Sequence, residues 1–173
     1  MSGIFLGTHF MHEFIFRSLV IGLWGTAAMD LWAMLLHRQV GITPPNWALV
    51  GRWFLHLPRG KIFHSDIAAS KSFPFESEAG WIAHYVTGII YGGILLHFGG
   101  EDYAHAPKLL PALILAWITV GAGWFILQPG MGAGWAASKR DNPWMIRFLN
   151  LVAHSWFGVG MYLGALIALK MVK

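Results

Sequence analysis

Apolar residues run through this chain in four long stretches, each separated from the next by a polar segment. The stretches cover residues of about 14–37, 79–98, 107–128 and 145–169. A helix that crosses a bilayer needs about 20 mostly apolar residues, because it rises by about 1.5 Å per residue. The pattern predicts an all-α integral membrane protein with four transmembrane helices, forming a single polytopic domain over residues 1–173.

A further helix is predicted in the loop between the first two spans, over residues of about 46–57. Asn46 follows two prolines, and its side chain suits the cap position at a helix N-terminus. Apolar residues then recur at helical spacing until Pro58 and Gly60 end the pattern. Because basic residues lie alongside, we expect this helix to rest in the headgroup region of the membrane.

The two halves of the chain resemble each other in three ordered matches. Ala-Ala-Ser-Lys occurs at residues 68–71 and again at 136–139, and each copy is followed by a histidine and then a tyrosine. The matched residues are His84 and His154, Tyr91 and Tyr162, and Asp30 and Gln128. These matches predict a tandem duplication of a two-helix unit. The alternative is that small residues recur because helix packing in lipid selects them.

The composition agrees with a membrane protein and excludes several other classes. Apolar residues make up 56% of the chain and charged residues 12%, whereas soluble domains carry about 25% charged residues. The chain has no cysteine, which excludes disulfides, thiolate metal sites and iron–sulfur clusters. The formal charge of +4 is too small and too dispersed for a nucleic-acid-binding face. We therefore expect the lipid bilayer as a partner and no nucleic acid.

The distribution of lysine and arginine predicts the orientation of the chain in the membrane. Eight of the twelve lie in or next to the loops that join spans one and two and spans three and four. Under the positive-inside rule these long loops face the cytoplasm, so both termini are expected on the periplasmic side of a bacterial inner membrane.

Each predicted span carries one polar side chain at a similar distance from the cytoplasmic boundary. These residues are Asp30, His84, Gln128 and His154. An ionisable group at the centre of a membrane helix costs about 2.5–3.5 kcal/mol on insertion scales, so it usually faces the bundle interior and has a partner. In a bundle of antiparallel neighbours the two histidines face each other and the aspartate faces the glutamine. The pattern predicts one candidate site, with Tyr91 and Tyr162 on nearly the same helix faces as the histidines.

Three chemistries fit this set of side chains. The first is movement of a proton, a cation or a small solute along Asp30, Gln128 and the two histidines. The second is a metal centre with Asp30, His84 and His154 as ligands. The third is a b-type haem held by His84 and His154 as cofactor-binding residues. The opposing explanation is that these groups bond one another only to lock the helices together.

From these alternatives we expect a small inner-membrane protein that binds and translocates a cation, proton or small solute, rather than an enzyme. A metal- or haem-binding membrane redox protein or enzyme is the first alternative. A non-catalytic subunit of a larger membrane complex is the second. Because four helices enclose little volume, we expect transport to be easier in a homo-oligomer, and a larger membrane complex is the other partner considered.

Several motifs along the chain also resemble those of a known family. They are Gly-Thr-Ala-Ala-Met-Asp-Leu-Trp at residues 25–32, Asn-Trp-Ala-Leu-Val-Gly-Arg-Trp at 46–53, Gln-Pro-Gly-Met-Gly at 128–132, and His154 followed by Gly158. Together they resemble a bacterial inner-membrane family catalogued as domain of unknown function 2938, and the resemblance covers nearly the whole chain. It implies a small polytopic inner-membrane protein of about four helices, and it implies no activity and no site residues.

Overall fold

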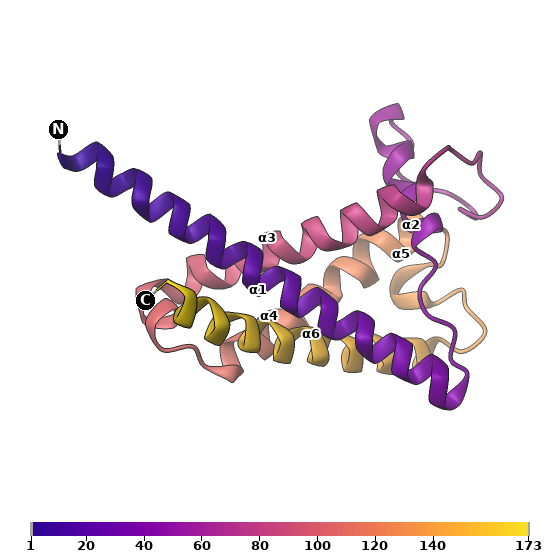
Figure 1. The fold of residues 1–173 in the computed structure, drawn as a ribbon. Coiled ribbons are helices and arrows are strands. Elements are labelled where there is room, and N and C mark those ends of the chain that lie inside the picture. Colours follow the sequence, from indigo (N-terminus) through magenta and orange to yellow (C-terminus); the bar gives the residue numbers. More distant parts are fainter. Residues whose placement is uncertain (1, 173) are drawn as a thin grey trace. The chain divides into compact units, whose positions relative to one another are not determined.

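The computed structural model describes residues 2–172, with side chains from residue 11 onward. Figure 1 shows its elements coloured along the sequence. Within the described residues the chain is helical and forms no strand. The longer helices are α1 (Ser2–Val40), α2 (Trp47–His56), α3 (Glu76–His105), α4 (Leu109–Ala122) and α6 (Pro143–Met171). The short elements are η1 (Leu57–Arg59), the π-helix η2 (Gly123–Leu127), α5 (Gln128–Gly130) and η3 (Trp135–Ala137).

Four helical segments are long and apolar enough to cross a membrane, as the sequence predicts. They are Met11–Val40, Glu76–His105, Leu109–Gly130 and Pro143–Met171. All four end later than the apolar runs, because backbone hydrogen bonding in a helix continues after the last apolar residue. The largest extension is in α3, whose helical conformation is interrupted at Gly100, with a φ of 60°. The chain is therefore an all-α, multi-pass membrane protein.

The helix in the first loop is bounded by its capping residues. The Asn46 side chain accepts hydrogen bonds from the backbone N–H groups of Ala48 (3.1 Å) and Leu49 (3.4 Å), which satisfies two donors of the first turn of α2. At the other end Pro58 lies in η1, and Gly60 has a left-handed φ of 72° that reverses the chain. The placement of this helix in the headgroup region stays a prediction.

The chain forms two compact units, and each is built from parts of all four long helices. The first unit holds the described residues up to Trp32, the segment Tyr85–Ala116 and the described residues from Ser155 onward. The second unit holds Ala33–His84 and Trp117–His154. Each long helical segment therefore passes from one unit to the other within its own length.

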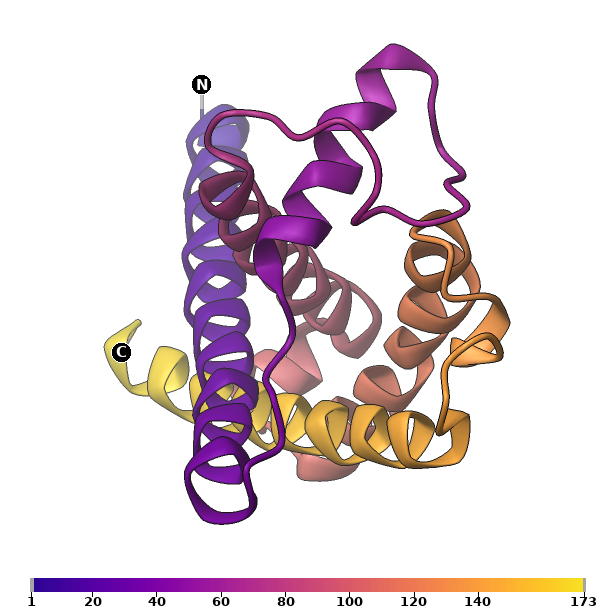
Figure 2. The same ribbon diagram turned by 90° about the vertical axis from the view of Figure 1, so that its right-hand side faces the viewer.

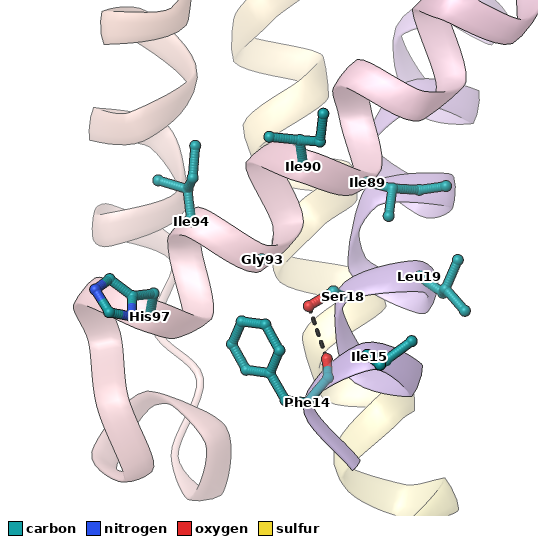
Figure 3. A pocket seen from close by; sticks show the side chains of 9 residues that line it. All are labelled: Phe14, Ile15, Ser18, Leu19, Ile89, Ile90, Gly93, Ile94 and His97. Carbon is teal, nitrogen blue, oxygen red and sulfur yellow. Dashed lines mark hydrogen bonds between the residues drawn. The ribbon is translucent and has the colours of Figure 1, made fainter. Parts of the chain in front are cut away.

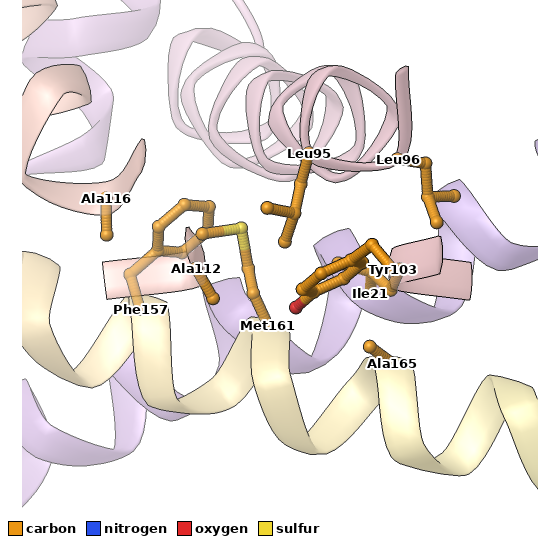
Figure 4. Packing of buried hydrophobic residues seen from close by; sticks show 9 residues of the cluster. All are labelled: Ile21, Leu95, Leu96, Tyr103, Ala112, Ala116, Phe157, Met161 and Ala165. Atoms are coloured by element: carbon orange, nitrogen blue, oxygen red, sulfur yellow. The ribbon is translucent and has the colours of Figure 1, made fainter. Parts of the chain in front are cut away.

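The first unit has an apolar core to which all four helical segments contribute, shown in Figure 4. Its buried residues are Ile21, Leu95, Leu96, Tyr103, Ala112, Ala116, Phe157, Met161 and Ala165. Small residues bring α1 and α6 close together beside it. A Cβ atom on Gly160 would lie 2.5 Å from the Trp24 carbonyl oxygen and 2.6 Å from the Ala28 Cβ. The two backbones are thus in contact, as is common where glycines line the crossing of membrane helices.

In the second unit, α2 is attached to the first turn of α3. Arg52 donates two hydrogen bonds to the Glu76 carboxylate, from Nε (2.9 Å) and from Nη2 (2.8 Å). The Arg52 Nη1 donates to the carbonyl oxygens of Ile67, Ala68 and Ser70 in the loop between the helices. The side-chain hydrogen bonds to Glu76 raise the pKa of Arg52, which therefore stays charged.

The same loop is also bonded to the end of the third span. The His64 backbone N–H donates to the Gly130 carbonyl oxygen (2.9 Å), and the Ile67 N–H donates to the Met131 carbonyl oxygen (3.1 Å). Figure 2 shows this loop reaching α5 after it leaves α2. The two long loops are thus held together within one unit.

Candidate functional site

Asp30 lies on α1 in the first unit, ten residues before the helix ends at Val40. At 1.5 Å per residue this is about 15 Å from the end of the span. The Tyr85 hydroxyl on α3 donates a hydrogen bond of 2.9 Å to the Asp30 carboxylate. Sequence reasoning found the aspartate and missed the tyrosine. A tyrosine inside a membrane span is ordinary, so the sequence by itself offered no signal for Tyr85.

The helices α1 and α3 approach each other closely along the turns that lead to Asp30. A Cβ atom on Gly92 would lie 2.6 Å from the Ser18 carbonyl oxygen, and Gly22 packs directly against the backbone of Ile89. Thr26, one turn before Asp30 on the same helix face, packs against Gly88. The close crossing explains why a side chain of α3 reaches the carboxylate.

Tyr91 and Tyr162, predicted to line the pathway, lie beside the apolar core of the first unit. The Tyr91 ring meets Phe157 edge-on, with ring centroids 6.3 Å apart. Both side chains are partly buried among apolar residues. Their role in an ion pathway stays a prediction.

His154 lies on α6 in the second unit and contacts the third span. Its Nδ1 shares a hydrogen bond of 3.1 Å with the hydroxyl of Thr119, a buried residue of α4. Sequence reasoning missed Thr119, because an uncharged threonine inside an apolar run does not indicate a functional site by itself.

Gln128 at the end of the third span contacts Asn150, which lies one helical turn before His154 on α6. The Asn150 side-chain oxygen accepts hydrogen bonds from Gln128 Nε2 (3.1 Å) and from Trp124 Nε1 (3.0 Å). The Gln128 side-chain oxygen is buried and has no hydrogen-bond partner among the described residues. The π-helix η2 sets this geometry: the Gln128 N–H bonds the Gly123 carbonyl five residues earlier, and Pro129 follows without an N–H of its own.

His84 lies near the start of α3 in the second unit. Its ring stacks on Trp47, the first residue of α2, with centroids 3.8 Å apart and planes inclined by 23°. The loop helix is therefore fastened to the histidine by its first turn.

Of the four predicted side chains, Asp30 belongs to the first unit, and His84, Gln128 and His154 belong to the second. Among the described residues, no three His, Asp or Glu side chains form a group that could hold a metal ion. The common pocket, the metal centre and the haem site stay predictions.

A shallow groove of about 420 Å³ runs between α1 and α3 in the first unit (Figure 3). It is lined by Phe14, Ile15, Ser18, Leu19, Ile89, Ile90, Gly93, Ile94 and His97. The Ser18 hydroxyl donates to the Phe14 carbonyl oxygen (2.7 Å), so the groove is almost wholly apolar apart from His97. None of the predicted site residues lines it.

Two further histidines are buried in the second unit, His56 at the end of α2 and His64 in the loop that follows. Neither was among the predicted site residues. His56 Nε2 donates to the Lys71 carbonyl oxygen and His64 Nδ1 donates to the Gly130 carbonyl oxygen, both at 3.1 Å. The two rings meet edge-on with centroids 4.7 Å apart. Burial lowers the pKa of His56, and the nearby basic groups His64, Lys61 and Arg59 lower it further. The neutral imidazole is therefore favoured there.

Comparison with known proteins gives one family and no relative of known function. A family model described as "Protein of unknown function (DUF2938)" matches residues 19–168. No curated protein and no solved structure matches the chain.

Proposed function

The chain belongs to the DUF2938 family of proteins of unknown function, and we propose that it binds and moves a small cation or a proton across a bacterial inner membrane. The proposal assigns the ion to Asp30. The observation that carries it is the hydrogen bond of 2.9 Å from Tyr85 to the Asp30 carboxylate, inside two membrane-spanning segments.

Placing a carboxylate inside a membrane span costs free energy, which its contacts or its function must offset. Insertion of an aspartate at the centre of a span costs about 2.5–3.5 kcal/mol, whereas one hydrogen bond to a charged group contributes about 1.5–3 kcal/mol. The hydrogen bond from Tyr85 is thus of the same order as the cost of inserting the carboxylate. We propose that the carboxylate serves a function besides helix packing.

The surroundings of Asp30 favour a proton or a hard cation over a transition metal. Thr26 is 1% exposed, and its hydroxyl has no hydrogen-bond partner among the described residues. The hydroxyls of Thr26 and Tyr85 and the Asp30 carboxylate all present oxygen atoms at the α1–α3 crossing. Oxygen donors suit protons and hard cations.

The second unit supplies polar groups that support passage of an ion. His154 with Thr119, and Gln128 with Asn150, place titratable or hydrogen-bonding side chains along the inner parts of the third and fourth spans. Histidine changes its charge near neutral pH, so it suits a proton relay. We propose that the loops of this unit face the cytoplasm and that both termini face the periplasm, as the positive-inside rule predicts. We further propose that the working form is an oligomer, because one bundle encloses little volume.

The test is ion flux in proteoliposomes made from the purified full chain. Proton, Na⁺ and K⁺ gradients are imposed one at a time and followed with ion-sensitive dyes. We expect wild-type flux for at least one ion, loss of that flux in Asp30→Asn, and a reduced rate in Tyr85→Phe. Asp141→Asn is the matched control, because Asp141 is an exposed loop residue of the same type.

Rates are normalised to the folded fraction recovered from the vesicles. The proposal fails if wild-type vesicles conduct no better than empty ones. It also fails if Asp30→Asn retains the wild-type rate per folded molecule while losing thermal stability, since that result assigns Asp30 to packing alone.

A further inference from the structure

The net charge of the chain falls entirely on the second unit. That unit carries eight of the twelve Lys and Arg and four of the eight Asp and Glu, an excess of four positive charges. The first unit has four of each and is balanced. One acidic residue of the second unit, Glu76, forms an ion pair with Arg52.

Five of the seven remaining cations of the second unit lie on the two long loops. We call Arg59, Lys61, Lys71, Lys139 and Arg140 the basic loop surface. All five side chains are exposed, and among the described residues none of them forms an ion pair. The loops that carry them are joined by the backbone hydrogen bonds from His64 to Gly130 and from Ile67 to Met131. The loops that carry these cations are therefore held to each other within the second unit.

Exposed aromatic side chains lie in the same loops and at the start of α6. Phe63 is 69% exposed, Phe75 76%, Trp135 62% and Trp144 75%. Side chains of this size are seldom exposed to water together, and tryptophan beside arginine or lysine is typical of the membrane–water interface. The Arg147 guanidinium lies over the Trp144 ring at 4.6 Å, so the two residue types are already paired in the structure.

We propose that the basic loop surface binds the phosphate headgroups of anionic phospholipids in the membrane that the four helices cross. Positive charge complements the headgroup, and the exposed aromatic rings enter the adjacent headgroup–acyl boundary. Each lysine or arginine near an anionic surface strengthens binding about fivefold. This inference stands independently of ion transport through Asp30.

The test measures thermal unfolding of the full chain in detergent while phosphatidylglycerol or zwitterionic phosphatidylcholine is added. Two double variants, Lys61→Gln with Lys71→Gln and Lys139→Gln with Arg140→Gln, each remove two cations from the surface. Lys108→Gln with Lys170→Gln is the matched control, since it removes two exposed cations from the first unit. Native mass spectrometry of the same samples counts the retained lipids.

We expect phosphatidylglycerol to raise the unfolding temperature of the wild type more than phosphatidylcholine does. Each loop double variant should need about 25-fold more phosphatidylglycerol for the same rise, whereas the control should match the wild type. The inference is overturned if the control loses as much as the loop variants, because net charge alone then explains binding. It is also overturned if the two lipids act equally, or if inorganic phosphate alone reproduces the effect, which would indicate a site for a free anion.

Discussion

At Asp30 a membrane helix carries a carboxylate whose oxygen accepts a hydrogen bond from Tyr85, a residue 55 positions away in the chain. The aspartate is visible in the sequence because a charge inside an apolar run is rare. Its partner is not visible, because a tyrosine in a membrane span is ordinary. Thr119, which contacts His154, and Asn150, which contacts Gln128, were also missed, because both residues are uncharged.

The buried His56 makes stability depend on pH. Burial and the neighbouring basic groups hold the pKa of His56 below its ordinary value of about 6.5. At mildly acidic pH the unfolded chain therefore binds a proton that the folded chain resists, so protonation favours unfolding. We expect the unfolding temperature to be highest above about pH 6.5 and to fall as the pH is lowered below it.

Thermal unfolding in detergent between about pH 8 and pH 5 measures this slope. His56→Gln removes the titration and keeps an amide donor for the Lys71 carbonyl oxygen, so it should flatten the slope. His105→Gln replaces an exposed histidine at the end of α3 and should leave the slope unchanged. Equal slopes in all three proteins would contradict the assignment.

Among the elements, α1 is crossed closely by both α3 and α6 where glycines line the contacts. Gly160 of α6 fits against the α1 backbone, where an added Cβ would meet the Trp24 carbonyl oxygen at 2.5 Å. Alanine in place of glycine normally stabilises a helix by about 1 kcal/mol. At Gly160, however, the added Cβ would clash with α1 and force the two helices apart. We expect Gly160→Ala to reduce the free energy of unfolding by about 1–3 kcal/mol.

The matched control is Gly121→Ala in α4, where the nearest atom to an added Cβ is Phe125 Cδ2 at 3.6 Å. This contact is ordinary, so the variant should be neutral or stabilising. Chemical or thermal unfolding in detergent compares the two. If both variants behave alike, the close α1–α6 crossing is not the source of the effect.

At the scale of the whole molecule, the segregation of charge predicts how the protein sits in the membrane. The chain has no cysteine, so single cysteines report their own side of the bilayer. Ser72→Cys lies in the first long loop and Ala106→Cys lies in the loop between α3 and α4, and both positions are exposed. We expect a membrane-impermeant maleimide to label Ala106→Cys in intact cells, and Ser72→Cys only after the inner membrane is permeabilised.

Permeabilised cells, in which both positions should react, provide the control for folding and reactivity. The reverse pattern would invert the proposed orientation and would place the basic loop surface on the periplasmic side.

The number of membrane spans, their approximate positions and the all-helical class were determined by the sequence itself. The reason is that a bilayer accepts few backbone structures and demands long apolar runs, so the signal is local and repeated over many residues. The family resemblance rested on equally local motifs and is confirmed by the match over residues 19–168.

The partners of the polar side chains were decided only by tertiary structure. Tyr85 reaches Asp30 because glycines let α1 and α3 touch, and Gln128 reaches Asn150 because a π-helix turns the end of the third span. Such contacts join residues far apart in the chain and depend on crossing distance and helix rotation. Hydrophobic periodicity reports which face of a helix is apolar, and it carries no information on which neighbour that face will meet.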